Sequence, residues 1–290
     1  MLWQRRCTGS VIVVTSPPPE HVRSAFAVAA AEPQHLPGGR SLAFRCGDVV
    51  LKPVDNAAEA SWLAAAFEQL RVDGIRIARP VRSSDGRWVV SGWSAQRFVS
   101  GRPAPRFGEI ISVGVELHRA LAGLPRPKFL DHAEGLYSWA DRISWGESAA
   151  STEGLGEGVG ADTFAALAAG RHDVDLPSQV VHGDLVGNVL FAGSAPPAVI
   201  DITPFWRPPL WASAVAVVDA VAWGGADPEM AAALQQQTHW RQMLRRALMF
   251  RLAISLAHPR STSESLVGVL SAVQLLEPMM NENLPGLGAH

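Results

Sequence analysis

The chain has 290 residues, of which 48% are hydrophobic and 18% are charged, and its formal net charge is −2. This composition is typical of a globular protein and excludes a disordered one, and it lacks the basic excess of nucleic-acid-binding proteins. No apolar run approaches the roughly 20 residues that span a bilayer. Cys7 and Cys46 form neither a disulfide framework nor a metal-binding spacing, which is typical of a cytoplasmic protein. From the charge, the apolar runs and the cysteines together we expect a cytoplasmic protein without nucleic-acid or membrane partners.

The first hundred residues predict a small sheet with one or two helices. The apolar run near the N-terminus is too short for a signal peptide, and we interpret residues 1–14 as a flexible N-terminal extension. Prolines at 17–19 are typical of a helix start. The predicted strands are Leu42–Cys46 and Val49–Lys52, joined by a Gly47-Asp48 turn, then Trp88–Trp93 and Ala95–Val99, with a helix over Asn56–Leu70 between the two pairs.

The remainder of the chain is mainly helical in its patterns. We expect helices over Phe107–Leu121 and Thr163–Ala169, a loop over 144–160, short buried strands at 179–182, 189–191 and 198–200, and three long helices from Ala212 to about Asn283. The sequence therefore predicts an α+β protein with a small β-rich N-lobe, residues 15–98, and a larger, mainly helical C-lobe, residues 99–290.

Polar residues stand at the ends of the three short apolar strands in the segment 179–201. Asp184 and Asn188 lie in the turn between the first two strands, and Asp201 follows the third. Because apolar strands are buried, they hold these residues rigidly at a surface, where we expect their side chains to converge. Two carboxylates and an amide oxygen suit Mg²⁺, which takes few protein ligands together with phosphate oxygens.

The strings His182-Gly183-Asp184, Asn188 and Ile200-Asp201 resemble the catalytic loop and metal-binding segment of the aminoglycoside phosphotransferase family, a branch of the protein-kinase-like fold. The resemblance implies that Asp184 is the catalytic base and that Asn188 and Asp201 bind the metal. It also implies a structural role for His182.

Two further features belong to the same resemblance. The kinase pattern has its Asn five residues after the Asp, whereas Asn188 comes four after Asp184, and we expect Gly187 to absorb the tighter turn. Asp219, in an apolar helical segment, resembles the buried acid that braces the catalytic loop, which is structural support and not catalysis.

The N-terminal half offers a nucleotide site that fits the resemblance. Lys52 ends a strand after a hairpin and resembles the lysine that holds the α- and β-phosphates, with Glu59 of the next helix as the residue that orients it and Glu68 as the fallback. A solvated lysine is the alternative. By resemblance, backbone N–H groups of the turn Gly38, Gly39 and Ser41 would cover the phosphates, and backbone groups of Gln96 and Phe98 would pair with adenine.

The segments around the predicted acceptor site carry charge and aromatic rings. Residues 131–175 hold nine acids and two bases, a balance that would attract a cationic acceptor, although a solvated acidic surface is the alternative. Trp206 and Trp211 are candidates for walls of the acceptor pocket and Arg207 for neutralising phosphate charge; packing against the next helix is the alternative. A basic helical stripe is interpreted as solvated or salt-bridged: His239, Arg241, Arg245, Arg246 and Arg251.

These features and the resemblance together predict a bilobal protein-kinase-like enzyme that uses ATP and Mg²⁺. Its N-lobe would bind the nucleotide, and its C-lobe would carry the catalytic and acceptor-binding residues. It would transfer the γ-phosphoryl group to a hydroxyl of a small molecule, either an aminoglycoside-like compound or a metabolite. The alternative is a pseudokinase-like protein that binds a nucleotide or a partner without catalysis.

Overall fold

The computed structural model describes residues 16–36, 43–147 and 151–281. They fall into two compact units. The β-rich unit combines the chain up to Ala104 with Arg119–Asp131 and Gly187–Thr203, and the helical unit combines Pro105–His118, His132–Val186 and the chain from Pro204 onward. The lobe boundaries expected at 15–98 and 99–290 stay a prediction, and the expected extension 1–14 lies outside the described residues.

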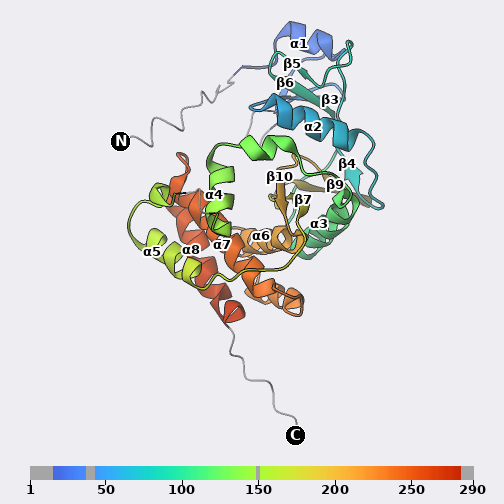
Figure 1. The fold of residues 1–290 in the computed structure, drawn as a ribbon. Coiled ribbons are helices and arrows are strands. Elements are labelled where there is room, and N and C mark those ends of the chain that lie inside the picture. The colour runs from blue at the N-terminus through green and yellow to red at the C-terminus, as the bar shows by residue number, and fades with distance from the viewer. Residues whose placement is uncertain (1–15, 37–42, 148–150, 282–290) are drawn as a thin grey trace. The chain divides into compact units, whose positions relative to one another are not determined.

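An antiparallel sheet with the strand order β1-β2-β3-β6-β5 forms the centre of the β-rich unit (Figure 1). The predicted Gly47-Asp48 turn joins β2 to β3, and Gly47 has a φ of +64°, which glycine adopts without steric cost. Phe44, Leu51 and Trp93 are buried in the core under this sheet. The strands are β1 (Gln34–Leu36), β2 (Ala43–Cys46), β3 (Val49–Pro53), β5 (Val89–Val90) and β6 (Trp93–Arg97), and the helix α1 (Glu20–Ala25) precedes them.

The helix α2 (Ala57–Glu68) begins where the sequence predicts. Asn56 caps it, because its side-chain oxygen accepts hydrogen bonds from the N–H groups of Ala58 and Glu59 at 3.0 and 3.2 Å. Such a cap contributes about 1 kcal/mol.

A second sheet of the β-rich unit has the order β4-β9-β8. Strand β4 (Arg76–Ile77) is parallel to β9 (Ala195–Val199), which is antiparallel to β8 (Val189–Ala192). The hairpin that carries Asn188 and Asp201 therefore lies in the same unit as β3, which carries Lys52.

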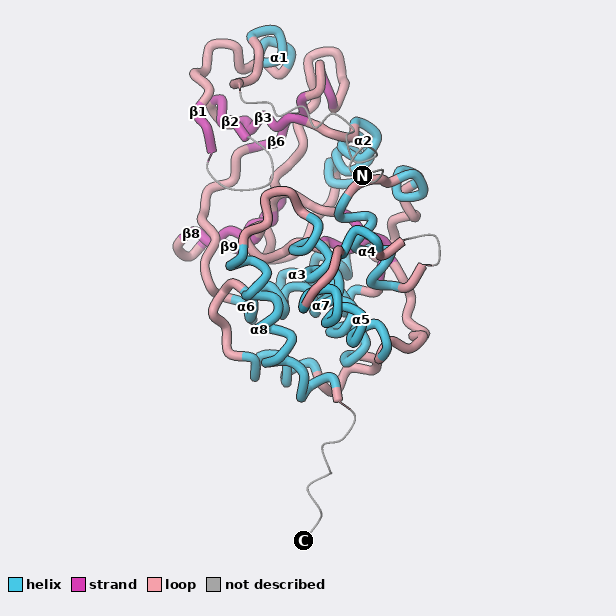
Figure 2. The backbone as a smooth tube through the Cα atoms, turned by 90° about the vertical axis from the view of Figure 1, so that its left-hand side faces the viewer, coloured by secondary structure: helices cyan, strands magenta, loops and turns pink. Residues whose placement is uncertain are grey.

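The helix α7 (Trp240–Ala257) is the centre of the helical unit and packs against α4, α6 and α8 (Figure 2). Leu244, Leu248 and Phe250 on this helix are fully buried. Burying each such side chain stabilises a protein by about 1.5–3 kcal/mol, so this core dominates the stability of the unit. Its elements are α3 (Phe107–Leu121, shared with the β-rich unit), α4 (Leu136–Trp145), η2 (Glu153–Leu155), α5 (Val159–Ala169), β7 (Gln179–His182), β10 (Pro204–Arg207), α6 (Pro209–Ala222), η3 (Pro228–Leu234) and α8 (Ser263–Met280); η1 (Lys128–His132) lies at the boundary of the two units.

The three long helices predicted after residue 212 are confirmed as α6, α7 and α8. The loop expected over 144–160 is wrong in part, because the end of α4, the short helix η2 and the start of α5 lie there. Within this segment Leu155 of η2 is buried in the core of the helical unit, so tertiary packing overrides the Gly- and Ser-rich composition that suggested a loop. Among the described residues, no helix has both the length and the apolar character needed to cross a membrane.

Candidate active site

The hairpin β8–β9 carries two of the predicted metal ligands. The N–H of Ile200 donates to the carbonyl of Asn188 at 3.0 Å, so Asn188 and Asp201 leave the hairpin at the same end. Gly187 has a φ of +90°, a conformation that favours glycine, and this confirms the tight turn predicted for the shortened loop. Asn188 therefore directly follows this turn and directly precedes β8.

Lys52 of β3 forms an ion pair with Asp201, and both side chains are half-buried. Burial lowers the pKa of Lys52 to about 7. Asp201 has a φ of +49°, which Asp tolerates better than most side chains. The structure therefore brings together the lysine predicted for phosphate and the carboxylate predicted for metal.

The donors of the β-rich unit fit a nucleotide-bound magnesium ion. Among the described residues, no cluster of three or more His, Cys, Asp or Glu side chains could hold a metal ion by itself. Mg²⁺ bound with a nucleotide needs only one or two carboxylates, because phosphate oxygens and water complete its shell. The carboxylate of Asp201 and the amide of Asn188 are donors of this kind, and a role for Lys52 at phosphate stays a prediction.

The partners predicted for Lys52 have separate positions. Glu59 lies in the first turn of α2. Glu68 pairs with Arg82 and not with Lys52, because its two carboxylate oxygens accept hydrogen bonds from Arg82 at 3.0 Å each. The carboxylate that the structure places against Lys52 is that of Asp201, and the orienting role of Glu59 stays a prediction.

The segment predicted to hold adenine is the end of β6 and the residues after it. Gln96 pairs with Val50 of β3, and the N–H of Phe98 donates to the carbonyl of Asp48 at 2.8 Å. That donor is already used within the β-rich unit, so an adenine edge here would rely on other backbone groups. The predicted phosphate-covering residues lie outside the described part of the chain: Gly38, Gly39 and Ser41.

Asp184 belongs to the helical unit, where it follows β7 and joins a buried ion triad. Its Oδ1 accepts a hydrogen bond from Nη2 of Arg251 at 2.8 Å. The same guanidinium also binds Asp219 of α6, because Nε and Nη2 donate hydrogen bonds to its two carboxylate oxygens at 2.6 and 2.5 Å. Burial opposes the charge on Arg251, but the carboxylates of Asp219 and Asp184 outweigh it and raise the pKa of Arg251.

The basic stripe predicted on α7 is only partly a solvated face. Arg246 and Arg251 are buried, so solvent exposure is wrong for these two, whereas the predicted salt bridge is confirmed for Arg251. The sequence did carry a signal, since Arg251 stands within the apolar run 247–253 of a helix that is hydrophobic on most faces. A charge in such a run requires a buried partner. Asp219, predicted to brace the loop, reaches Asp184 through this arginine.

Two histidines support the backbone of the loop 182–186. Nδ1 of His182 accepts the N–H of Asp184 at 3.3 Å, and the N–H of His182 donates to Nε2 of His118 at 3.0 Å. Burial, together with the neighbouring His182, lowers the pKa of His118 to about 3, so this ring is neutral and accepts at Nε2 at physiological pH. His118 thus supports this loop, although no motif in the sequence marks it.

The loop 182–186 is also packed tightly on two sides. A Cβ added at Gly183 would lie 2.5 Å from the ring of Phe205. A Cβ added at Gly114 of α3 would lie 2.5 Å from Leu185, which is fully buried. Both glycines are therefore required by close approach and not by backbone conformation.

A pocket of about 240 Å³ opens at Asp184 within the helical unit. One wall is Trp223, an exposed aromatic side chain whose Nε1 donates to the carbonyl of Ser265 at 3.2 Å. The lining residues are Asp184, Val186, Asp219, Trp223, Gly224 and Arg251. The pocket is large enough for a small polar group to approach the carboxylate of Asp184.

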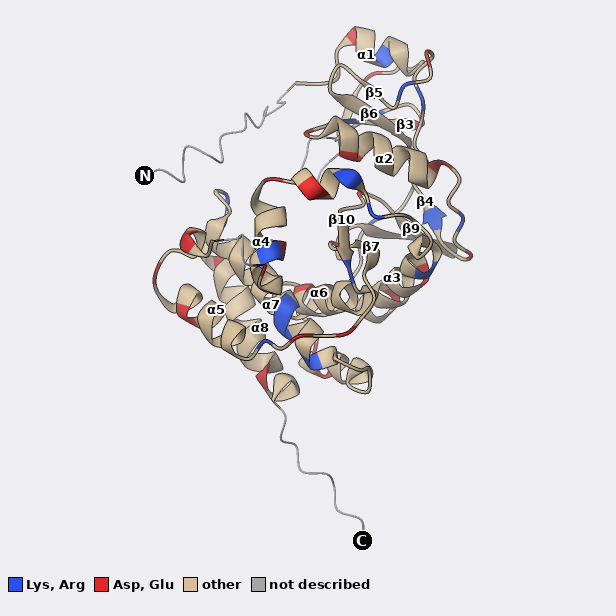
Figure 3. Ribbon diagram, in the orientation of Figure 1, with Lys and Arg blue, Asp and Glu red and all other residues tan. Residues whose placement is uncertain are grey.

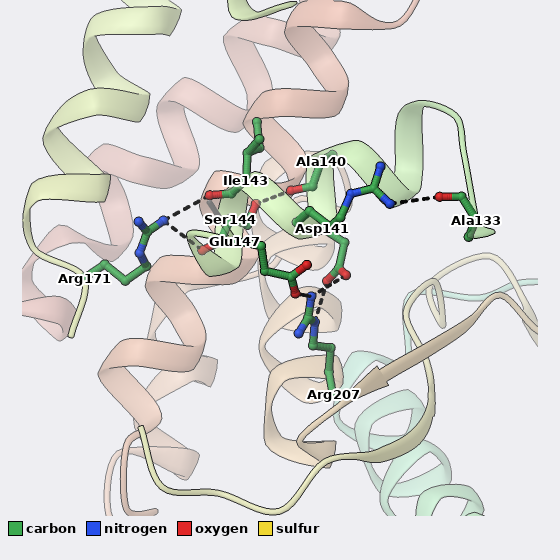
Figure 4. Close-up of polar contacts among 9 residues, drawn as sticks. Ala133, Ala140, Asp141, Ile143, Ser144, Glu147, Arg171 and Arg207 are labelled. Carbon is green, nitrogen blue, oxygen red and sulfur yellow. Dashed lines mark hydrogen bonds and ion pairs between the residues drawn. The ribbon is translucent and has the colours of Figure 1, made fainter. Parts of the chain in front are cut away.

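Arg207 lies in a second ion cluster of the helical unit (Figure 4). Its Nε and Nη2 donate to the two carboxylate oxygens of Asp141 at 2.8 and 2.7 Å, and Nη2 also donates to Glu147 at 2.7 Å. The guanidinium carbon lies 4.6 Å from the ring centre of Trp145. The charge of Arg207 is thus neutralised by the protein, which agrees with the packing alternative and leaves a phosphate role a prediction.

The two tryptophans predicted as acceptor walls differ in burial. Trp211 is fully buried and packs edge-to-face against Phe205 and Phe250, each with ring centres 5.3 Å apart. This is the packing role that the sequence leaves open as the alternative. Trp206 is half-buried on β10, and a role at the acceptor stays a prediction.

The acidic segment 131–175 is partly neutralised by the protein itself. Asp131 pairs with Arg126, and Asp141 and Glu147 pair with Arg207. Figure 3 shows charged residues of both signs spread over many helices and loops. The field that would steer a cationic acceptor is weaker than the charge count suggests, and the steering hypothesis stays a prediction.

Comparison with known proteins agrees with this geometry. The family model described as "Phosphotransferase enzyme family" matches residues 38–249. No curated protein sequence matches the chain.

Solved structures with the same fold are remote in sequence. An aminoglycoside phosphotransferase in ternary complex with AMP-PNP and hygromycin B is 14% identical, with 87% of this chain and 95% of that chain covered and a TM-score of 0.60. Spectinomycin phosphotransferase with ADP and spectinomycin is 13% identical, covering 90% and 96%, with a TM-score of 0.59. A choline/ethanolamine kinase family protein from Mesorhizobium loti is 18% identical, covering 90% and 96%, with a TM-score of 0.57.

These likenesses confirm the predicted α+β, kinase-like fold. The match of the family model extends over well more than half of the residues. The chain belongs to the phosphotransferase enzyme family.

Proposed function

We propose that the chain is a small-molecule kinase that moves the γ-phosphoryl group of Mg-ATP to a hydroxyl group. The observation that supports this most directly is the ion pair between Lys52 and Asp201. It joins the positive charge that phosphate requires to the hard oxygen ligand that Mg²⁺ requires, within one unit of the protein. Two structural neighbours were solved with AMP-PNP or ADP, which agrees with ATP as the donor.

The residues have separate tasks in this proposal. Lys52 holds the phosphates, and Asp201 with Asn188 holds the metal. A Mg²⁺ ion held by these residues would neutralise charge on the phosphates of ATP. Asp184 accepts a hydrogen bond from the acceptor hydroxyl and takes its proton as the phosphoryl group leaves ATP. Catalysis is then positioning and charge neutralisation.

The acceptor is a small molecule with an alcohol group. The structural neighbours include enzymes solved with hygromycin B and spectinomycin, and an aminopropanol kinase. These names span antibiotics and amino alcohols, so we propose an amine-bearing alcohol of either kind. The carboxylate of Asp184 at the pocket, together with the exposed ring of Trp223, is suited to a cationic group. ATP as donor also agrees with the cytoplasmic location expected from the sequence.

Nucleotide binding is tested first, by thermal unfolding with ATP, with and without Mg²⁺. ATP at 100 times its dissociation constant stabilises the folded protein by about 2.7 kcal/mol. We expect this shift to need Mg²⁺ in the wild type and to be lost in Lys52→Met and Asp201→Asn. Absence of a shift with any nucleotide would contradict the proposal.

Transfer is tested next, with ATP labelled at the γ-phosphate and a panel of aminoglycosides, amino alcohols and sugars. We expect label on at least one acceptor. Nucleotide binding without transfer to any acceptor would favour the pseudokinase-like alternative.

A further inference from the structure

The guanidinium of Arg251 connects two carboxylates of different environments. The side chains of Arg251 and Asp219 are 7% and 5% exposed, whereas that of Asp184 is 21% exposed and lines the pocket. We propose that Arg251 is a positioning residue: it locks the carboxylate of Asp184 to the core of the helical unit through Asp219. The kinetic part of this inference rests on the proposed function, and the structural part does not.

The geometry fixes the guanidinium before it meets Asp184. Asp219 takes two parallel hydrogen bonds from Nε and Nη2, which set the plane and direction of the group. Nη2 then donates to Oδ1 of Asp184 at 2.8 Å. The orientation of Asp184 is therefore set by α6 and α7, the two most buried helices of the unit, and not by its own loop alone.

The chemistry of the position argues for a role beyond stability. Ionic groups are costly to bury, and well-packed apolar side chains of similar volume are often at least as stabilising. An Arg at the centre of α7 therefore adds little stability that a Met would not, but it aims a carboxylate at the pocket. A reacting group displaced by about 1 Å loses rate on the order of 10²-fold, so fixing Asp184 has a large kinetic consequence.

Arg251→Met alone would take the guanidinium away from the buried carboxylate of Asp219, so it is combined with Asp219→Asn and compared with Asp219→Asn alone. Arg241→Met, an exposed arginine on the same helix, is the matched control. Arg251→Lys keeps the positive charge but lacks the planar guanidinium, and it replaces the double variant in the test if the double variant does not fold.

The first readout is hydrogen exchange of the backbone amides in the loop 182–186, which needs no activity. We expect exchange there to be about tenfold faster in the double variant than in Asp219→Asn, intermediate in Arg251→Lys, and unchanged in Arg241→Met. Unchanged exchange in the double variant, or in Arg251→Lys if that is the folded protein, would overturn the proposal.

The second readout is turnover of Mg-ATP, with water as the acceptor. We expect kcat to fall about 10²-fold while KM for ATP stays within about twofold, because Arg251 acts through Asp184 and not on the nucleotide. In an Asp184→Asn background the same change should cost less than about threefold. Decreases in kcat that multiply when the Arg251 and Asp184 changes are combined would overturn the proposal. A wild type with neither transfer nor ATP turnover would contradict the proposed function, and the hydrogen-exchange result would then decide on the role of Arg251.

Discussion

Replacing Arg207 by Met separates a structural role of this arginine from a role at phosphate. The side chains of Arg207 and Asp141 are 15% and 12% exposed and share two hydrogen bonds, at 2.8 and 2.7 Å. Removing one partner of such a buried pair typically costs about 3–5 kcal/mol. We expect the lower end, about 3 kcal/mol, because Glu147 in the same cluster is 44% exposed and loses little when its partner leaves.

Urea unfolding followed by circular dichroism measures this change in the free energy of unfolding. If the two units unfold in separate transitions, each transition is fitted by itself. Asp141→Asn in the Arg207→Met background should recover part of the loss, since it removes the unpaired carboxylate. Glu147→Gln alone should cost less than about 1 kcal/mol. If Arg207→Met unfolded at the wild-type midpoint but had lost most of its ATP turnover, the structural reasoning would be refuted in favour of phosphate binding.

Three further predictions concern protonation and packing. Burial lowers the pKa of His118 from an ordinary 6.5 to about 3, so between these pH values the unfolded chain binds one more proton than the folded chain. The free energy of unfolding therefore falls by about 1.4 kcal/mol per pH unit as the pH drops below 6.5. Urea unfolding midpoints at pH 5 and 6.5 should show that His118→Asn reduces this pH dependence by one proton. The pKa of Lys52, about 7, predicts that phosphate binding at pH 8 restores its charge and takes up a proton, which calorimetry in two buffers should detect in the wild type and not in Lys52→Arg. Gly183→Ala drives a Cβ into the ring of Phe205 and should destabilise by about 1–3 kcal/mol, with partial recovery in a Phe205→Leu background; an unaffected midpoint would show that the loop can shift.

Features encoded locally could be predicted from the sequence. The hairpin with Asn188 and Asp201, the glycine turn at Gly187 and the helix that starts at Asn56 all depend on residues within a few positions of one another. Their signals are turn chemistry, short apolar strands and an apolar stripe at helical spacing, which a single segment contains.

Pairings between distant segments could not be predicted in the same way. Arg251 meets Asp184 across 67 positions, and Arg207 meets Asp141 across 66. A sequence shows that a buried arginine needs a partner but not which carboxylate supplies it. The resemblance identifies Asp184 as chemically important. That Arg251 is the residue bonded to it follows only from the packing of α6 against α7.

The most direct test of the central claim is transfer of the labelled γ-phosphate from ATP to an acceptor by the wild type and by Asp184→Asn. The account predicts Mg²⁺-dependent transfer by the wild type. General-base catalysis contributes about 10²–10⁴-fold, so the variant should be slower by that factor, a loss of roughly 3–5 kcal/mol of transition-state stabilisation, while binding ATP equally well. An Asp184→Asn variant that transferred the label at the wild-type rate would contradict the account.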